Sequence, residues 1–352
     1  VRRRRIKAAG GEVVFWTCRA GRQIPSDAAR SLEPSVLRAE QTNTSVLFGD
    51  RMILKVFRRL GEGINPEQEV LRFLDERTGF DNIPPLLGGI EYRRQGAEPL
   101  TLALLEGFVP HGGEDAWGYT LDAIQRYLEA SMAGQPHAPA LESPGRGLME
   151  AAQEPVPQPV AEALGPYLES ARLLGQRTAE LHLALASVTD DPAFAPEPMS
   201  ADHQRSLYQT GRRLAARVLE ELRQRLGELD AEAAPLAEAL LEREAELMGR
   251  LRAVMGPRPD GVRIRCHGDY RLEQLLYTGR DFVVIDFEGD PTRSMSARRI
   301  KRSPLQDVAG MLRSLERAAD VALRRQLAMG AARPEDLPWL ARRAQAWSQH
   351  VG

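Results

Sequence analysis

The chain has 352 residues, of which 43% are hydrophobic and 27% are charged, a composition typical of a soluble globular protein. Its formal net charge of −2 gives no electrostatic basis for nonspecific binding to nucleic acid or to an acidic membrane. No uninterrupted apolar run reaches the roughly 18 residues of a membrane-spanning helix, and Cys18 and Cys266 form no disulfide framework. These features predict a cytoplasmic protein with no nucleic-acid or membrane partner.

Up to about residue 110 the pattern is mainly that of β-strands. Runs rich in β-branched and aromatic residues predict strands at 13–18, 45–49, 52–57 and 100–109. One helix interrupts them, with Asn65 as its N-cap, Pro66 in its first turn and Gly79 as its stop. The basic stretch before residue 12 is expected to be a solvated chain end. Strands with a single helix predict a small, β-rich lobe.

From residue 111 onward the pattern is mainly helical. Apolar periodicity predicts helices at 117–132, 161–187, 203–228, 233–255, 304–329 and 335–349. The last of these helices is still in progress where the chain ends, and no initiator methionine is present. Both features predict that the chain is a piece of something longer.

The stretch RCHGDYRLEQLLYTGRDFVVIDFEGD, residues 265–290, places acids around an apolar strand. Its two short strands form a hairpin over the turn TGRD, which brings Asp286 back beside the loop that carries Asp269. His267, Asp269 and Gln274 have the spacing of a kinase catalytic loop, H-x-D-x-x-x-x-N, with Gln in the Asn position. The segment IDFE that follows is close to the kinase motif DFG. A surface hairpin with scattered acids is the simpler alternative, but the spacing favours the kinase loop.

Phosphoryl transfer from a nucleotide needs few protein groups. We assign Asp269 as the carboxylate that takes the proton of the acceptor hydroxyl. Gln274 and Asp286 supply the oxygen ligands that Mg²⁺ prefers. Lys55 in MILKVF is the only lysine flanked on both sides by strand residues, and it is expected to neutralise the phosphates of ATP, with Glu69 as its ion-pair partner. The alternative is an exposed Lys55 and a Glu69 that only stabilises a helix dipole.

No glycine-rich GxGxxG motif is present, and AEQTNTSVLFGD (39–50) takes the place of a phosphate-binding loop. The candidates for phosphate contacts in this segment are Thr42, Asn43, Thr44 and Ser45. An ordinary polar turn is the alternative. The segment LLEGFVP (104–110) fits a hinge between lobes, where the backbone would meet adenine. The candidates there are Glu106, Phe108 and Val109.

Further polar residues have structural explanations beside functional ones. His182 lies on the apolar side of a predicted helix and is expected to be structural. Asp307 lies in the first turn of a predicted helix, where a dipole-stabilising acid is expected. A basic cluster follows the acids of residues 286–290, and one member could hold sugar hydroxyls or screen phosphate charge. Its members are Arg298, Arg299, Lys301 and Arg302, and a solvated basic turn is the alternative.

Four long segments carry a resemblance to a known family. They are AEQTNTSVLFGDRMILKVFRRLGEGINPEQEVLRFL, GPYLESARLLGQRTAELHLALAS, RCHGDYRLEQLLYTGRDFVVIDFEGDPTRS and RRIKRSPLQDVAGMLRS. Together they resemble bacterial maltokinases, particularly those fused behind trehalose synthase, in the aminoglycoside-phosphotransferase-like branch of the kinase fold. The resemblance implies an α+β, bilobal protein-kinase-like fold with a small β-rich N-lobe and a large, mainly helical C-lobe. It places a partial N-terminal cap region at 1–38, the N-lobe at 39–110 and a C-terminally truncated C-lobe at 111–352.

The resemblance also implies a reaction: phosphorylation of maltose by ATP at the anomeric hydroxyl, giving maltose 1-phosphate for α-glucan synthesis. Its cofactors would be ATP and Mg²⁺, its base Asp269, its metal ligands Gln274 and Asp286, and trehalose synthase a fused or associated partner. Arg271 and Glu273 depart from the family pattern HGDYHLGQ, in which His and Gly stand at these positions.

Two other functions fit the same residues. One is another sugar or aminosugar kinase, such as a glucosamine kinase. The other is a nucleotide-binding, non-catalytic module of a trehalose synthase fusion. Retention of Lys55, Asp269, Gln274 and Asp286 argues against the non-catalytic module.

Overall fold

The computed structural model describes residues 4–25, 31–37, 43–113, 115–133, 153, 155–231, 233–257 and 261–352. The chain divides into two compact units, one formed by residues 1–195 with 264–352 and the other by residues 196–263. None of the helices in the described ranges combines the length and the apolar character needed to cross a membrane.

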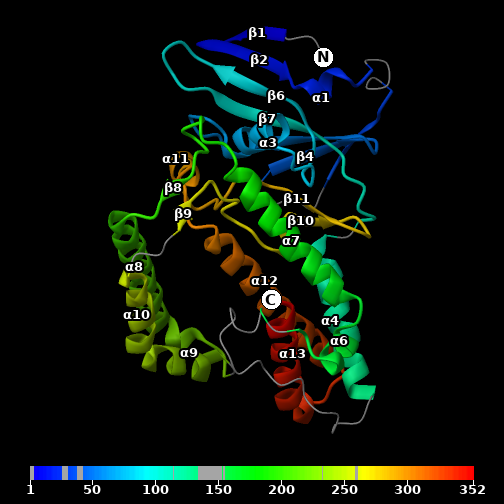
Figure 1. Ribbon diagram of the computed structural model, residues 1–352, viewed down its shortest axis with the longest axis vertical. Coiled ribbons are helices and arrows are strands. Elements are labelled where there is room, and N and C mark those ends of the chain that lie inside the picture. The colour runs from blue at the N-terminus through cyan, green and yellow to red at the C-terminus, as the bar shows by residue number, and fades with distance from the viewer. Residues whose placement is uncertain are drawn as a thin grey trace. The chain divides into compact units, whose positions relative to one another are not determined.

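The larger unit contains a seven-stranded antiparallel sheet with the order β1-β2-β6-β7-β5-β4-β3 (Figure 1). Its strands are β1 (Arg4–Ala8), β2 (Gly11–Thr17), β3 (Pro34–Val36), β4 (Asn43–Phe48), β5 (Met52–Phe57), β6 (Leu86–Arg93) and β7 (Leu100–Gly107). Strands β2, β4, β5 and β7 correspond to the four stretches predicted from sequence, although β2 and β4 end one residue earlier than predicted and β7 ends at Gly107 instead of residue 109. The basic start of the chain forms the exposed edge strand β1, where a solvated chain end was expected. The sheet therefore takes strands from both sides of residue 38, and the division of the chain at that residue stays a prediction.

Strand β6 is missing from the sequence prediction because Gly88 and Gly89 weaken its strand pattern. In the sheet these two glycines pair with Thr17 and Trp16 of β2. A Cβ atom at Gly89 would stand 2.5 Å from the indole ring of Trp16, and one at Gly88 would stand 2.3 Å from its carbonyl oxygen. The glycines are therefore required by the close approach of Trp16.

Helix α3 (Pro66–Arg77) follows the sheet strand β5 and starts as predicted. The side chain of Asn65 accepts a hydrogen bond from the backbone N–H of Gln68 at 3.1 Å, which satisfies one of the free donors of the first turn. The short helix α1 (Arg19–Arg22) follows β2. Helix α3 thus carries its first-turn acids, Glu67 and Glu69, from a fixed starting point.

The rest of the larger unit is mainly helical. Its helices are α4 (Ala116–Ala133), α6 (Gln158–Leu164), α7 (Tyr167–Leu185), α11 (Met295–Arg298), α12 (Leu305–Ala328) and α13 (Leu337–Val351). Short 3₁₀ turns lie at Leu272–Gln274 and Pro334–Asp336. The helix predicted at 161–187 is divided into α6 and α7 because Gly165 takes a positive φ of 56° and Pro166 follows it.

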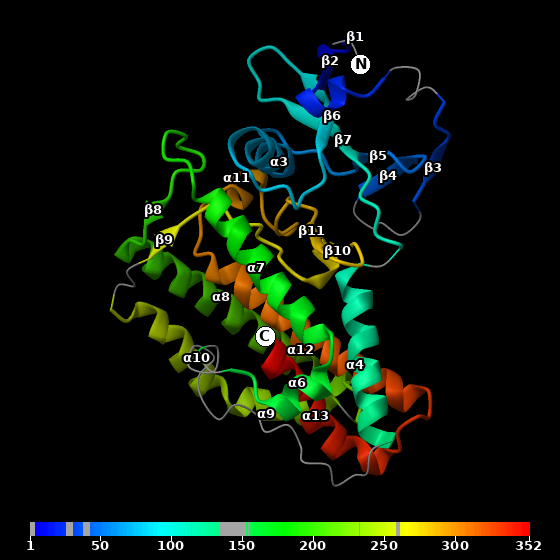
Figure 2. The same ribbon diagram turned by 45° about the vertical axis from the view of Figure 1, so that its right-hand side comes forward.

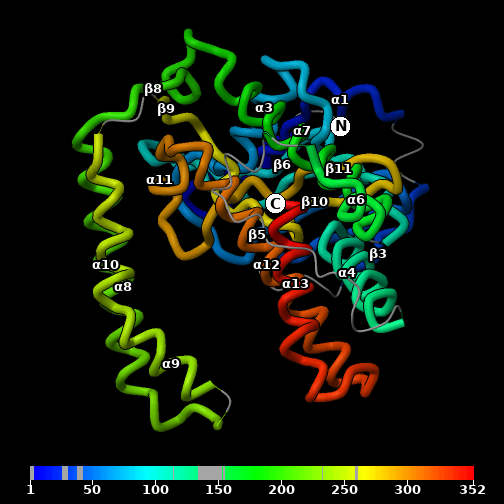
Figure 3. Tube along the Cα trace, turned by 60° about the horizontal axis from the view of Figure 1, so that its bottom comes forward, coloured from blue at the N-terminus to red at the C-terminus, as the bar shows by residue number. Residues whose placement is uncertain are grey.

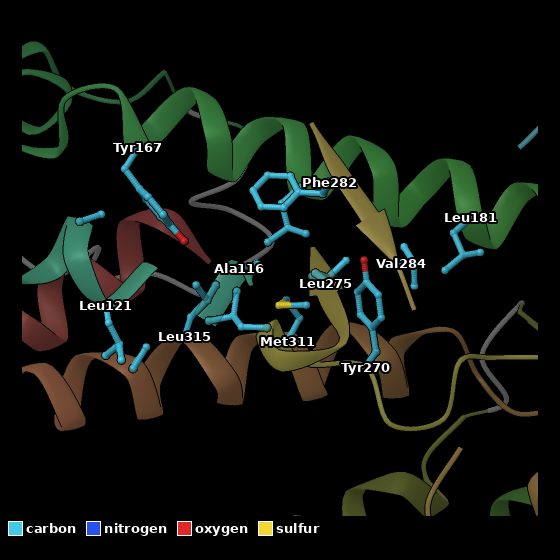
Figure 4. Packing of buried hydrophobic residues seen from close by; sticks show 14 of the residues in the cluster. Ala116, Leu121, Tyr167, Leu181, Tyr270, Leu275, Phe282, Val284, Met311 and Leu315 are labelled. Carbon is cyan, nitrogen blue, oxygen red and sulfur yellow. The ribbon is translucent and has the colours of Figure 1, made fainter. Parts of the chain in front are cut away.

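The hairpin of β10 (Leu275–Tyr277) and β11 (Phe282–Val284) lies beside α7 in both ribbon views (Figures 1 and 2). Figure 4 shows its apolar side chains between α7 and α12. Leu275, Phe282 and Val284 are at most 1% exposed, and burial of each such side chain contributes about 1.5–3 kcal/mol. The hydroxyl group of Tyr270 lies 2.9 Å from that of Thr178 on α7. The hairpin and the loop before it therefore rest on a packed apolar base.

The smaller unit is built from α8 (Ala201–Arg225), α9 (Ala233–Glu242) and α10 (Glu244–Arg252), with the strands β8 (Glu197–Pro198) and β9 (Val262–Arg263) and 3₁₀ turns at Leu226–Glu228 and Ala253–Met255. Helix α8 packs along α10 and against α9 (Figure 3). The apolar residues that predicted α8, Leu207, Leu214 and Val218, are 42%, 51% and 49% exposed. Their face is thus only partly covered within this unit.

Candidate active site

Lys55 of β5 lies at the centre of a cluster of acids. Its Nζ atom is 2.9 Å from Glu67 Oε2, 2.6 Å from Asp286 Oδ1 and 2.8 Å from Glu288 Oε1. Burial alone would lower the pKa of Lys55, but the three carboxylates together raise it well above its usual range. The ammonium group is therefore charged at neutral pH and holds together β5, α3 and the segment after β11.

The predicted pairing of Lys55 with Glu69 is wrong, because Glu67 takes that place. The two glutamates are two residues apart on α3, which turns them about 200° from each other around the helix. Glu69 instead accepts hydrogen bonds from Nη2 and Nε of Arg299, at 2.6 and 2.8 Å, and from Nη1 of Arg265 at 2.7 Å. Burial raises the pKa of Glu69, but the hydrogen bonds from Arg299 and Arg265 outweigh it and leave the pKa lowered.

We expect Glu69→Ala to destabilise the fold and Glu67→Ala to weaken nucleotide binding. Without Glu69 the guanidinium of Arg265, which is 2% exposed, loses its carboxylate, and breaking a buried ion pair costs about 3–5 kcal/mol. Without Glu67, Lys55 keeps Asp286 and Glu288 and so stays ion-paired but less fixed in position. Urea unfolding and titration calorimetry with Mg·ATP measure the two effects. If Glu69→Ala lost ATP affinity at unchanged stability, the result would support the pairing of Lys55 with Glu69 that was predicted from sequence.

Asp269 and Gln274 lie beside Asp286, as the loop spacing predicts. Nε2 of Gln274 is 3.5 Å from Oδ2 of Asp269, and the Gln274 side chain also helps to lower the pKa of Asp286. Burial raises the pKa of Asp269, and Arg271 opposes that shift only in part. Burial also raises the pKa of Asp286, but Lys55 outweighs it and lowers the pKa below its usual value. The two carboxylates thus lie in different electrostatic surroundings, with the pKa of Asp269 raised and that of Asp286 lowered.

Asp286 has a backbone conformation that residues other than glycine rarely adopt. Its φ of 63° is the only positive value among the non-glycine residues of the described ranges. Such a conformation costs on the order of 1–3 kcal/mol and is often found at functional sites. Here it goes with a carboxylate that reaches Lys55 from directly after the hairpin.

The loop before Asp269 is anchored by Asp307 of α12, whose side chain is 1% exposed. Asp307 accepts the backbone N–H groups of His267 and Gly268, both at 2.9 Å, and lies 3.1 Å from Nε2 of His182. Burial raises the pKa of Asp307, but the hydrogen bond from His182 and the other donors outweigh it, so the group is ionised. Asp307 therefore does more than stabilise the dipole of its helix, and His182 is structural, as expected.

The two departures from the maltokinase pattern both have partners in the loop. Nη2 of Arg271 is 3.4 Å from Oδ2 of Asp269. Glu273 accepts a hydrogen bond from Arg317 of α12 at 2.7 Å. Glu273 thus ties the loop to the helix beneath it, and Arg271 lies against the carboxylate assigned as the base.

The polar segment predicted to contact phosphates begins outside the described residues, where Thr42 lies. Asn43 starts β4, and its Nδ2 donates to Oε1 of Glu288 at 2.6 Å. Thr44 accepts a hydrogen bond from Arg58 at 3.0 Å, and Ser45 is buried opposite Lys55. Of these side chains, Asn43 therefore lies next to the acid cluster, and phosphate contacts of the segment stay a prediction.

The predicted hinge, residues 104–110, begins inside β7 and continues beyond its end at Gly107. Phe108 donates its backbone N–H to the carbonyl of Arg51 at 2.8 Å, and the carbonyl of Val109 lies 2.8 Å from Nδ1 of His111. Glu106 pairs in register with Ile53 of β5, and its charge contributes to the raised pKa of Lys55. Of the three predicted residues, Glu106 is therefore the one whose charge affects the pKa of Lys55.

The basic cluster is used mainly for structure. Arg299 binds Glu69, while Lys301 and Arg302 donate to backbone carbonyls at 2.7 and 3.2 Å. Arg298 is the member beside the acids, with Nη1 3.9 Å from Oε2 of Glu288. Arg298 is therefore the one of the four that can act on groups at the site.

Sequence analysis assigned no role to two acids of the site, Glu67 and Glu288. Carboxylate oxygens of Glu67, Asp286 and Glu288 lie within 4.8 Å of one another. Carboxylate oxygens such as those of Asp286 and Glu288 are ligands that a hard cation like Mg²⁺ prefers. Gln274 as a further ligand stays a prediction, because the nitrogen of its amide is the atom that lies beside Asp269. The position of Glu288 directly after Asp286 and Phe287 was the available signal, because it brings a second acid to the end of the same strand.

The arrangement of the groups around Lys55 is typical of one class of protein. A lysine on a sheet strand pairs with a helix acid and with an aspartate after a hairpin, next to a loop carrying an aspartate and an amide. This is the arrangement of a kinase. No family model matches the chain.

Known proteins that resemble the chain are glucosamine kinases. It is 26% identical over 287 residues to a glucosamine kinase of Streptacidiphilus jiangxiensis and 28% identical over 302 residues to one of Mycolicibacterium smegmatis. These matches cover 81% and 84% of this chain, but only 54% and 61% of the relatives. The chain thus spans little more than half the length of the relatives it matches.

Solved structures agree on the fold. A glucosamine kinase in complex with glucosamine, ADP and inorganic phosphate superposes with a TM-score of 0.62 at 20% identity, covering 98% of this chain and 68% of that one. A second crystal form gives 0.61 at 22% identity, with coverage of 96% and 68%. The predicted α+β, kinase-like fold is confirmed.

Proposed function

We propose that the chain transfers a phosphoryl group from ATP to a hydroxyl group of glucosamine. The observation that carries the reaction type is the ion pair of Lys55 with Asp286, next to Gln274 and Asp269. The glucosamine kinase relatives support the acceptor. We therefore favour glucosamine over maltose, the acceptor implied by the sequence resemblance, and the comparisons give no support to an association with trehalose synthase.

Each group has a task in this reaction that its surroundings suit. Lys55, kept charged by its carboxylates, would bind phosphate oxygens of the nucleotide, and Glu67 would hold it in place. Asp286 and Gln274, with Glu288 beside them, would hold Mg²⁺, which neutralises charge on the phosphates when bound. Asp269 would orient the acceptor hydroxyl and take its proton.

The carboxylates around Lys55 bear on nucleotide binding. Glu288 is bonded at once to Lys55 and to Asn43 at the start of β4. Phosphates that bind Lys55 would compete with these contacts. When no nucleotide is bound, the carboxylates would keep Lys55 ion-paired.

A panel of glucosamine, maltose, glucose and trehalose with ATP and Mg²⁺ tests the acceptor. We expect glucosamine to be phosphorylated at least about tenfold faster than the others at equal low concentration, a difference of about 1.4 kcal/mol in transition-state binding. Phosphorus NMR of the product identifies the hydroxyl group that is modified. Preference for maltose would return the protein to the maltokinase interpretation. Absence of turnover with ATP still bound would favour a non-catalytic nucleotide-binding module.

A further inference from the structure

A cavity of about 560 Å³ lies on the face of the sheet region formed by β2, α1 and α3. Among the described residues its lining is Trp16, Thr17, Cys18, Arg19, Arg22, Arg72 and Glu76. None of these belongs to the cluster around Lys55. A volume of this size is within the range that small ligands occupy.

The cavity is separated from the Lys55 cluster by the geometry of α3. Arg72 and Glu76 are one helical turn apart and so share a face of the helix. Glu67, which binds Lys55, is five residues before Arg72 and therefore turned by about 140° from it around the helix. One helix thus presents an acid to Lys55 and an arginine to the cavity.

The lining is rich in positive charge. Three arginines face one carboxylate, that of Glu76. Burial raises the pKa of the Cys18 thiol above its usual value, so at neutral pH the thiol adds no negative charge. The net charge of the lining is therefore +2, from three arginines and one glutamate.

Trp16 and Arg72 stack against each other beside the cavity. The guanidinium of Arg72 stacks over the indole ring of Trp16 at 4.7 Å, and Trp16 is only 7% exposed. Within the described part of the chain, neither Nε1 of Trp16 nor Nε of Arg72 has a hydrogen-bond partner. Both atoms are enclosed by the protein. The rest of the Arg72 side chain, and not these two N–H groups, therefore lines the cavity.

From these observations we propose that the cavity binds a small phosphate monoester. The three guanidinium groups of the lining are donors only, which favours a ligand with acceptor oxygens. A phosphate monoester carries about −1.5 to −2 charges at pH 7 and so matches the two excess cations, whereas a carboxylate would leave one uncompensated. Arginine is the residue best suited to bind phosphate through paired N–H groups. The remaining volume accommodates the organic part of the ester.

Calorimetric titration with glucose 6-phosphate and with inorganic phosphate tests the site. We expect Arg72→Gln and Arg22→Gln each to weaken binding of glucose 6-phosphate by about tenfold or more, since each removes a charge-assisted contact. Arg77→Gln is the matched control on α3, because Arg77 pairs with Asp190 and does not line the cavity. Titration in the presence of saturating Mg·ATP is the control for phosphate bound at the nucleotide site, and it should leave this binding unchanged.

The outcomes separate the possible ligands. Tighter binding of glucose 6-phosphate than of inorganic phosphate supports a monoester, whereas equal binding would overturn recognition of the organic part. No binding of either, or binding that saturating Mg·ATP abolishes and both cavity variants keep, would overturn the proposal. Trp16 fluorescence is a second readout, and Arg22, being exposed on α1, can be changed without disturbing the core. Sugar turnover plays no part in these measurements, so they stand apart from the proposed function.

Discussion

Replacing Asp269 with asparagine is expected to lower kcat for sugar phosphorylation by about 10²–10⁴-fold, the usual contribution of a positioned general base. ATP affinity should stay close to that of the wild type, because Asp269 contacts Gln274 and Arg271 and not Lys55. Steady-state kinetics and calorimetry with Mg·ATP measure the two quantities separately. Asp202→Asn, which changes an exposed acid of α8, is the control for loss of one charge.

The raised pKa of Asp269 gives this assignment a pH signature. A base acts in its deprotonated form, so kcat/KM should fall as pH is lowered through the pKa of Asp269. Burial places that pKa above the ordinary aspartate value of about 3.9, and the acid limb should shift accordingly. A variant Asp269→Asn that kept more than about a tenth of wild-type kcat would assign the proton transfer to another group.

Asp286→Asn is expected to weaken Mg·ATP binding by at least about tenfold, because it removes the charged oxygen ligand nearest to Lys55. Asparagine is chosen because it tolerates the positive φ of this position better than alanine does. The fold should therefore be kept while the charge is lost. Calorimetric titration at several Mg²⁺ concentrations measures both affinity and metal dependence.

Asp290→Asn is the matched control for Asp286→Asn. Asp290 belongs to the same acidic segment but is bonded to Thr292 and Arg293, away from Lys55. Its replacement should leave Mg·ATP binding unchanged. Equal weakening in both variants would mean that the segment acts only through its summed negative charge.

The features that sequence predicted well depend on short stretches of chain. The loop that carries Asp269 and Gln274 and the hairpin leading to Asp286 span fewer than thirty residues of the printed sequence, so spacing alone brings their side chains together. The N-cap at Asn65 and the strand position of Lys55 are local in the same sense. Local geometry fixes such features before any long-range packing is known.

The missed features depend on how distant segments meet. Choosing between Glu67 and Glu69 requires the rotation of α3 relative to β5, which no pattern within the helix specifies. The bond between Asn43 and Glu288 joins residues 245 positions apart. The apolar stripe of α8 predicted a helix correctly, but it could not show that Leu214 would be 51% exposed in a separate unit.

The sugar acceptor is a further feature for which the sequence resemblance and the comparisons differ. The roles proposed for Asp269, Gln274, Asp286 and Lys55 would suit any transfer of phosphate from ATP to a hydroxyl group, so these residues carry no information about the sugar. The resemblance implied maltose, and the relatives favour glucosamine. Residues outside these four must therefore select the acceptor.

The carboxylate of Asp307 has a consequence for how activity is acquired during folding. It joins α12 to His182 of α7, 125 positions earlier, and to the backbone of His267, 40 positions earlier. The loop that holds Asp269 has little secondary structure of its own and takes its shape from these bonds. Nascent chain that has reached Asp269 but not Asp307 therefore lacks the bonds that shape this loop. The proposed phosphoryl transfer would then require that α12 be synthesised and docked.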